Sequence, residues 1–331
     1  MRKVFLLFLL VGIFSGSALA GSYQYFRLGR PEDAATTPTA GIAMMGGGDD
    51  IDVAFRWLCE KGGGGDFLIL RARGDNDYNA YVNGLCKTNS VATLIIPDRE
   101  SAEDPAVAAI IRHAEAIFIA GGDQARYVNF WKGTPVQDAI NDQLASGRPI
   151  GGTSAGLAVL GQFVYGATQD KEDDKDLSSA QVLQNPYIAR VALVRDFLKV
   201  RNLENTITDS HFAKRDRMGR TLGFLARLMQ DGWSKEPRDI AIDEKSAVLV
   251  ESDGKAAVVG TGRGAYFIRP TKPPKACRAG VPLIFEGIDV YHVPANGQFD
   301  LSRWRGQGGE GYRLTVEGGV VHSSGARNSI Y

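Results

Sequence analysis

Short apolar segments alternate with segments of helical apolar spacing over the first half of the chain, and this order limits the possible folds more than any other feature. The expected strands are residues 39–45, 67–70, 91–96 and 116–120 and the apolar residues around Ile150. The expected helices are residues 51–61, 104–115 and 135–145. Such alternation is typical of a parallel sheet covered by helices on both faces. The sequence therefore predicts an α/β fold with a three-layer parallel-sheet domain.

The second half of the chain has a different pattern. Further short strands are expected at residues 239–242, 246–250, 256–259 and 265–269. Pro270–Pro274 marks a boundary, and the Gly-rich and aromatic residues that follow predict a small β-rich C-terminal appendage. The expected organisation is a signal peptide at 1–20, an N-terminal arm at 21–38, the α/β domain at 39–270 and a β-rich C-terminal extension at 271–331.

Residues 1–20 have the features of a secretory signal peptide. A basic start precedes an apolar run at residues 4–14, and Ala18-Leu19-Ala20 supplies small residues before an expected cleavage at Gly21. The apolar run is too short for a stable membrane span. We therefore expect a secreted or periplasmic protein that has no membrane association after signal cleavage.

The charge balance gives no indication of a nucleic-acid partner. Cleavage would remove two basic residues, so that 36 basic residues would face 38 acidic ones at a net charge of −2. A nucleic-acid-binding protein typically carries a basic excess.

The three cysteines, Cys59, Cys86 and Cys277, are too few for a disulfide framework and lack zinc spacing. Export permits one disulfide, either Cys59 to Cys86 or Cys86 to Cys277, with the remaining thiol buried. The sequence leaves this pairing open.

Gly152, Ser154 and Gly156 fit a G-x-S-x-G turn between a strand and a helix. Small flanking residues allow a tight turn that exposes the serine hydroxyl, and the first backbone N–H groups of the helix can face an oxyanion. This pattern arises often by chance in a chain with 40 glycines, and the alternative is a glycine-rich turn without a catalytic role. The apolar segments on both sides favour Ser154 as a nucleophile.

A nucleophilic serine needs a base, and the chain has four histidines. His211 lies in a dense polar cluster at residues 208–220, whereas His292 and His322 lie in the β-rich region and are interpreted as structural. We therefore predict His211 as the base. A solvated, basic helix start is the alternative interpretation of the arginines in this cluster.

Asp243 and Glu244 follow the predicted strand at 239–242 and could supply the acid that orients the histidine. Neighbouring strand residues point to opposite faces, so one of the two carboxylates is expected to face His211. We predict Glu244. The alternative is a solvated strand end.

Other polar segments follow the predicted strands. Gly46–Gly48 lacks dinucleotide-binding spacing and has no Walker lysine, so a phosphate site is not expected. Asp75 and Asp77 resemble the start of a calcium loop, but Ala80 stands where glycine is needed, which favours a polar loop lining the pocket. The charged residues 169–179 are predicted to form a solvated loop, with a lid as the alternative. No metal site and no cofactor are predicted.

Four segments together resemble the cyanophycinase family of serine peptidases, which are relatives of the aspartyl dipeptidases. These segments are Gly121-Gly122-Asp123-Gln124, Gly151–Gly156, Asp209–Arg220 and Ile240–Ala247. The resemblance covers most of residues 39–270 and implies a class I glutamine amidotransferase-like fold of the flavodoxin type.

The resemblance also implies roles for individual residues. It matches Ser154 to the nucleophile, His211 to the base and Glu244 to the acid, and it implies an oxyanion hole from the N–H groups of Gly122 and Ala155. The implied substrate-binding residues are Gln124, Asp209, Arg215, Arg217 and Arg220. Typical members read Asp-Gln-His-Phe around the histidine, whereas this chain has Ser210 in place of that glutamine. The departure bears on substrate choice.

The leading hypothesis is an exported serine peptidase that cuts cyanophycin, a poly-aspartate carrying arginine on its β-carboxyl groups, into aspartyl-arginine dipeptides through an acyl-enzyme. An aspartyl or isoaspartyl dipeptidase with the same triad is one alternative. An α/β-hydrolase-type esterase would instead use His322 with an acid such as Asp300, and an exported binding protein would have lost turnover. The family resemblance also suggests a homodimer.

Overall fold

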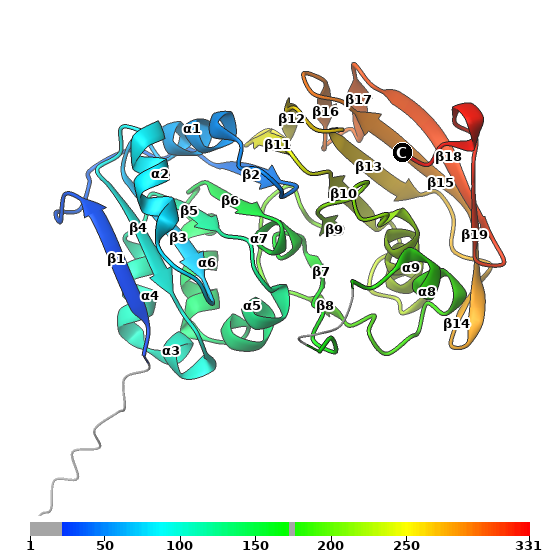
Figure 1. Cartoon of the computed structure of the whole chain (residues 1–331), viewed down its shortest axis with the longest axis horizontal. Coiled ribbons are helices and arrows are strands. Elements are labelled where there is room, and N and C mark those ends of the chain that lie inside the picture. Colours follow the sequence, from blue (N-terminus) through cyan, green and yellow to red (C-terminus); the bar gives the residue numbers. More distant parts are fainter. Residues whose placement is uncertain (1–21, 172–175) are drawn as a thin grey trace, which may run out of the picture.

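The computed structural model of the chain describes residues 22–171 and 176–331 (Figure 1). The predicted signal peptide and its cleavage position lie outside these residues, as do residues 172–175 of the charged segment. Two β-sheets with their covering helices form the described part of the chain.

The first sheet has ten strands among the described residues, in the order β1-β4-β3-β5-β6-β2-β11-β12-β16-β17. Their bounds are β1 Gln24–Gly29, β2 Gly41–Met45, β3 Asp66–Arg71, β4 Ser90–Ile95, β5 Ala116–Ile119, β6 Ile150–Thr153, β11 Ser246–Glu251, β12 Lys255–Gly260, β16 Gln298–Asp300 and β17 Arg305–Gln307. The strands from β4 to β2 pair in parallel, and the outer pairs are antiparallel. This parallel centre is the sheet that the sequence predicts.

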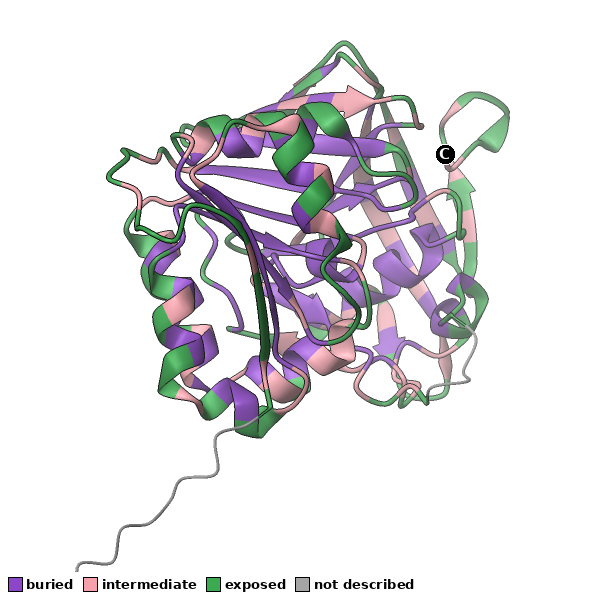
Figure 2. Cartoon of the chain, turned by 60° about the vertical axis from the view of Figure 1, so that its left-hand side comes forward, coloured by how far each residue is buried: buried purple, intermediate pink, exposed green. Residues whose placement is uncertain are grey.

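Helices cover both faces of this parallel centre because its strands are apolar on both sides. Phe67 and Ile69 of β3 belong to the core under α1 (Asp52–Lys61) and α2 (Asp77–Leu85). Leu68 and Leu70 face the opposite core. The helices on that side are α3 Arg99–Glu103, α4 Pro105–Arg112, α5 Gln124–Trp131 and α6 Pro135–Ala145. Figure 2 shows the buried strands between helices with exposed outer faces.

The second sheet follows the order β19-β18-β15-β13-β10-β9-β7-β8, and β14 pairs with β15. The bounds are β7 Phe163–Tyr165, β8 Leu193–Arg195, β9 Thr206–Asp209, β10 Arg238–Ile242, β13 Ala265–Pro270, β14 Ala276–Arg278, β15 Val281–Val293, β18 Glu310–Glu317 and β19 Val320–Ser323. Helices α8 (Ser179–Gln184) and α9 (Met218–Gln230) pack on one side of it. Strands β7, β9 and β10 are parallel to one another.

The predicted α/β class with parallel strands and a β-rich C-terminal region is confirmed. The structure differs in detail, because the strands form two sheets and the strands after residue 270 join both of them. Helices α2, α3, α5 and α8 are not among the predicted helices, and α2 and α5 each follow a polar loop.

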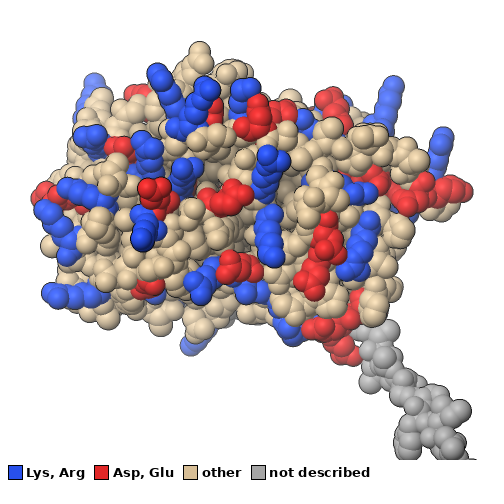
Figure 3. All heavy atoms as spheres, turned by 180° about the vertical axis from the view of Figure 1, so that it is seen from behind, with Lys and Arg blue, Asp and Glu red and all other residues tan. Residues whose placement is uncertain are grey.

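One disulfide joins Cys59 of α1 to Cys86 at the end of α2, and Cys277 is a buried free thiol. The structure thus selects one of the two pairings that the sequence leaves open. Among the described helices, none combines the length and apolar character needed to cross a membrane. Basic and acidic side chains are interspersed over the face seen in Figure 3, in agreement with the near-zero net charge.

Candidate active site

Ser154 lies at a sharp turn between β6 and the short helix α7 (Ala155–Ala158). Its backbone has φ 52° and ψ −115°, which is an unfavourable conformation for a residue with a side chain. A hydrogen bond from the Ser154 N–H to the Met45 carbonyl and one from the Ala158 N–H to the Ser154 carbonyl hold the turn. The turn therefore presents the hydroxyl at the carboxyl end of a parallel strand, as the G-x-S-x-G pattern predicts.

The two glycines of this pattern are required by close packing. A Cβ atom on Gly156 would lie 1.9 Å from the Ile119 carbonyl oxygen. A Cβ atom on Gly152 would lie 2.5 Å from the Gly156 carbonyl. Any larger residue would therefore push α7 away from the sheet and move Ser154.

Ser154, His211 and Glu244 form a continuous chain of hydrogen bonds. The Ser154 Oγ lies 2.7 Å from His211 Nε2, and His211 Nδ1 lies 2.7 Å from Glu244 Oε1. His211 follows β9, and Glu244 lies in the turn between β10 and β11. The structure thus brings together the three residues that the sequence predicts as nucleophile, base and acid. The neighbouring Asp243 instead accepts a hydrogen bond from the backbone N–H of Lys214.

The glycine loop after β2 forms a close wall for the imidazole. The backbone N–H of His211 donates to the Gly46 carbonyl at 2.8 Å, and the backbone N–H of Lys245 donates to the Gly47 carbonyl at 2.9 Å. A Cβ atom on Gly47, whose φ is +92°, would lie 2.4 Å from His211 Cε1. The sequence analysis does not assign this role to Gly46–Gly48. Consecutive glycines at the end of a strand are the signal for it.

The electrostatic surroundings favour the neutral form of His211. Burial lowers the pKa of the imidazole below its ordinary value, and the charges of Arg215 and Arg217 lower it further, while the hydrogen bond to Glu244 acts in the opposite direction. A neutral imidazole whose Nδ1–H donates to Glu244 leaves Nε2 as an acceptor for the Ser154 hydroxyl. This is the arrangement required of a general base.

Gly122 and Ala155, the implied oxyanion donors, line the same cavity as Ser154. Ala155 is the first residue of α7, so its N–H has no acceptor within the helix. Gly121 lies close to the serine, because a Cβ atom on Gly121 would lie 3.5 Å from the Ser154 Cβ. The position of both backbone segments is compatible with an oxyanion hole.

The cavity in front of Ser154 and His211 has a volume of about 730 Å³. The basic residues that line it are Arg71, Arg73, Arg126, Lys171, Arg215 and Arg217. The acidic ones are Asp123, Asp170 and Asp176. Among the lining residues that the structure describes, six basic ones face three acidic ones, so this lining suits a ligand with carboxylate groups.

The implied substrate-binding residues fall into two groups. Gln124, Arg215 and Arg217 line the cavity, whereas Asp209 and Arg220 do not. Arg220 is 1% exposed and donates to Asp209 from Nε at 2.9 Å and from Nη2 at 2.6 Å. The expectation of direct substrate contact needs correction for these two residues, because their buried ion pair lies behind the cavity wall.

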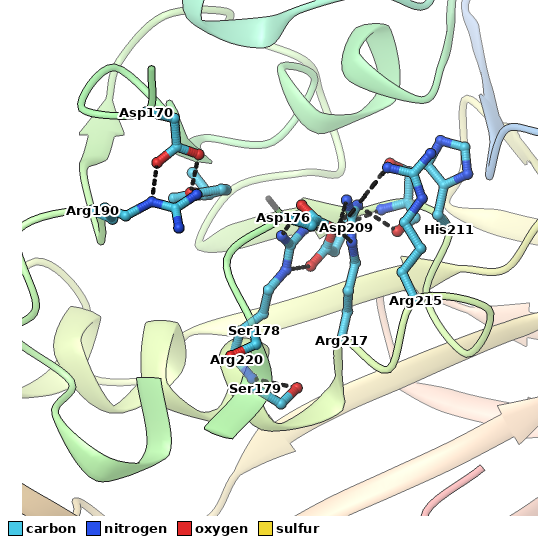
Figure 4. Close-up of polar contacts among 12 residues, drawn as sticks. Asp170, Asp176, Ser178, Ser179, Arg190, Asp209, His211, Arg215, Arg217 and Arg220 are labelled. Carbon is cyan, nitrogen blue, oxygen red and sulfur yellow. Dashed lines mark hydrogen bonds and ion pairs between the residues drawn. The ribbon is translucent and has the colours of Figure 1, made fainter. Parts of the chain in front are cut away.

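The described residues 169–171 and 176–178 form a loop in which Asp176 is exposed, as predicted, but Asp170 and Asp176 also pair with arginines. Asp170 accepts a hydrogen bond from Arg190 Nε at 2.6 Å, and Asp176 accepts one from Arg217 Nη2 at 2.6 Å (Figure 4). Charge pairing with residues distant in sequence draws both side chains onto the protein.

The remaining candidates lie elsewhere. Asp75 caps the backbone of Asp77 and pairs with Arg71, which does not resemble a calcium loop. His322 lies on β19, and Ser154 has His211 as its partner. Among residues 22–171 and 176–331, the carboxylates close enough to share a metal ion are those of Asp33, Asp66 and Glu115.

Comparisons with known proteins find similarity to one family of peptidases. The model of Peptidase family S51 matches residues 73–187. A cyanophycinase from Trichormus variabilis is 29% identical over 183 residues, which are 55% of this chain and 54% of the relative. A cyanophycinase from Synechococcus elongatus is 26% identical over 234 residues, which are 67% of this chain and 66% of that relative. The chain thus spans about half the length of the first relative.

A solved structure supports the fold. The crystal structure of a peptidase from an acI-B1 Actinobacterium aligns with a TM-score of 0.50 at 18% identity, covering 79% of this chain and 97% of that one. The matches confirm the resemblance to the cyanophycinase family that the sequence motifs indicate, and they agree with the prediction of a serine-type peptidase.

Proposed function

We propose that this protein is a serine peptidase that cleaves amide bonds of aspartyl-containing substrates, with cyanophycin as the first candidate. The observation that carries the proposal is the hydrogen-bonded chain of Ser154, His211 and Glu244, with 2.7 Å at each link, in the wall of a basic cavity. Each group is of the type and in the order that acyl transfer requires.

In the first half-reaction, the Ser154 Oγ attacks the scissile carbonyl carbon while His211 Nε2 takes the hydroxyl proton. Glu244 accepts the hydrogen bond from Nδ1–H of His211 and stabilises the imidazolium that forms. The N–H groups of Gly122 and Ala155 donate to the oxyanion. The C–N bond then breaks, and the proton on Nε2 passes to the leaving amine, which gives an ester on Ser154.

In the second half-reaction, water replaces the amine. His211 Nε2 takes a proton from water, and the resulting hydroxide attacks the ester carbonyl. The C–O bond to Ser154 breaks, and the proton returns to the serine oxygen. The product leaves with a free carboxylate, and the enzyme regains its starting protonation state.

The charge of the cavity supports an acidic substrate. Arg215 is 46% exposed at its side chain and lies at the cavity wall beside His211, where its guanidinium can bind a carboxylate through two hydrogen bonds. The names of the relatives favour cyanophycin among substrates of this kind. An aspartyl or isoaspartyl dipeptide would meet the same basic groups, so it is the second candidate substrate.

Two other functions are less well supported. An esterase with His322 as the base would require that ring to reach Ser154, and His211 already contacts the serine at 2.7 Å. A binding protein without turnover would not need the strained serine backbone or the buried neutral imidazole.

The cellular location forms part of the proposal. The disulfide between Cys59 and Cys86 favours an oxidising compartment, and the predicted signal peptide favours export. We propose a secreted or periplasmic enzyme. Detection of the processed chain outside the cytoplasm, with Gly21 at its N-terminus, would support it, whereas an unprocessed cytoplasmic chain would contradict it.

The decisive experiment compares three substrates. The purified mature protein is incubated with insoluble cyanophycin, a β-aspartyl dipeptide and an α-aspartyl dipeptide, and the products are identified by mass spectrometry. Release of aspartyl-arginine from cyanophycin supports the first candidate, and cleavage of a dipeptide alone supports the second. If none of the three is cleaved and a fluorophosphonate leaves Ser154 unlabelled, the peptidase proposal is wrong. Light scattering of the same sample tests the predicted homodimer.

A further inference from the structure

Asp176 pairs with all three arginines of the polar cluster after β9, and Arg215 Nη1 lies 4.0 Å from its Oδ2 (Figure 4). Its Oδ2 accepts hydrogen bonds from Arg217 Nε at 3.1 Å and Arg217 Nη2 at 2.6 Å. Its Oδ1 accepts one from Arg220 Nη1 at 3.3 Å. Asp176 and Asp209 therefore bind Arg217 and Arg220 through short hydrogen bonds, whereas the contact of Asp176 with Arg215 is longer.

These contacts occupy the face of Arg217 that a substrate carboxylate would need. A guanidinium binds a carboxylate through two parallel N–H groups, and the Nε and Nη2 groups of Arg217 already donate to Asp176. Its Nη1 donates to the Ser210 carbonyl at 2.8 Å and lies 3.2 Å from Asp209 Oδ1. Arg217 is thus bound on both sides by groups of the chain itself.

The second side of Arg217 leads directly to the catalytic histidine. Ser210 precedes His211, and the backbone of His211 has φ +48°, an unfavourable conformation for a residue with a Cβ atom. The Ser210 N–H also donates to Asp209 Oδ1 at 2.8 Å. Bonds from Asp209 and Arg217 to both ends of Ser210 hold this turn in place.

Asp176 lies two residues before Ser178, the N-cap of α8. The Ser178 side chain caps this helix, and the Ser179 hydroxyl donates to the Asp216 carbonyl and accepts the Arg220 N–H. The segment that carries Asp176 therefore leads into a helix that packs on α9 and is bonded to Arg220.

We propose that Asp176 is a positioning residue for His211, and that it converts Arg217 from a substrate ligand into a support for the Ser210–His211 turn. Arg215 then remains as the arginine of this cluster that binds the substrate carboxylate. The inference rests on the proposed serine chemistry and deepens it, because it assigns substrate binding and base alignment to different arginines.

A small neutral fluorophosphonate tests the alignment of Ser154 and His211 without any carboxylate on the probe. We expect Asp176→Asn, which keeps the size and removes the charge, to slow the labelling of Ser154 by about tenfold or more, because small misplacements of catalytic groups are costly. Asp253→Asn, the matched control, removes a carboxylate from the turn between β11 and β12, outside the cavity, and should leave labelling within about twofold of the wild type. An unchanged labelling rate for Asp176→Asn would overturn the proposal.

Steady-state kinetics on the best aspartyl substrate supply the second readout. Asp176→Asn should lower kcat with little change in KM, and Arg215→Gln should raise KM. If Asp176 instead occupies the place of a substrate carboxylate, its removal would lower KM and leave labelling intact, which contradicts the proposal. Asp176→Glu should recover part of the lost kcat because it restores the charge.

The pH dependence separates positioning from a general loss of structure. Removal of the Asp176 carboxylate leaves the charge of Arg217 less compensated near the imidazole, so the acid limb of the labelling rate should move to lower pH. Thermal unfolding of each variant monitors the fold. A wild type that resists labelling would refute the proposed function itself, whereas a labelled wild type with an unaffected Asp176→Asn would refute this inference alone.

Discussion

The hydroxyl of Ser154 lies 2.7 Å from Nε2 of His211, although the serine follows a strand of the ten-stranded sheet and the histidine follows a strand of the other. The active site therefore exists only when the two sheets are correctly packed. Glu244, in the turn that joins β10 of one sheet to β11 of the other, completes the connection.

Substitution of the triad should separate the roles of the histidines. We expect Ser154→Ala and His211→Ala each to lower kcat by a factor of about 10⁴ or more, because the triad acts as a unit. His322→Ala should retain nearly full activity, since the ring lies on β19 away from the triad. Initial rates on the best substrate provide the measurement, and loss of activity only in His322→Ala would reject the assigned base.

The acid limb of the pH–rate profile should reflect the lowered pKa of His211. Burial, Arg215 and Arg217 all disfavour the imidazolium, so the base should remain neutral to a pH below the ordinary histidine value of 6.5. Arg215→Gln removes one positive charge and should move this limb to higher pH. Measurement of kcat/KM from pH 4 to 9 tests the direction, and a limb that moves to lower pH in this variant would contradict it.

Gly47→Ala should abolish activity through a steric effect on the imidazole. The new Cβ atom would lie 2.4 Å from His211 Cε1, and the φ of +92° disfavours any residue with a side chain. The ring must therefore move away from Ser154. Gly84→Ala is the matched control, because no atom lies within 4 Å of the added Cβ in α2. This control should be active and slightly more stable, by about 0.5–1 kcal/mol.

The disulfide should contribute measurably to stability. Closing a loop between residues 27 apart restricts the unfolded chain, and the loop-entropy relation gives about 3.5 kcal/mol. The double variant Cys59→Ser, Cys86→Ser should show that loss by denaturant unfolding. A reducing agent should lower the free energy of unfolding of the wild type, because it breaks the disulfide. Cys277→Ser leaves the disulfide intact and should not cause this loss. Equal stability of the oxidised and reduced wild type would refute the prediction.

Local patterns predict much of the fold and the core of the site. The G-x-S-x-G turn marks Ser154 because the spacing of glycines reports directly on the backbone there. The single histidine within a polar cluster and the paired carboxylates after a strand mark the other two members. These signals are visible because each depends on a few neighbouring residues.

Contacts between distant segments are not predictable in the same way. The sequence places Asp176 in a run of charged residues that predicts a solvated loop. In the structure it pairs with Arg217, 41 residues further along the chain. Arg220 resembles a substrate ligand in the sequence, yet Asp209 buries it behind the cavity wall. The ion-pair partners and the burial of such residues depend on which helices pack together, and a short sequence motif carries no information on that packing.

The amino-acid sequence alone determined the parallel strands, the strained serine turn and the three side chains proposed to react, because apolar periodicity and turn chemistry act over short distances. Tertiary structure decided that two sheets meet at the site, that Gly47 backs the imidazole and that two carboxylates bind Arg217 and Arg220. Those outcomes depend on packing and on the strength of charge pairing in a partly buried environment, which arise only when remote parts of the chain come into contact.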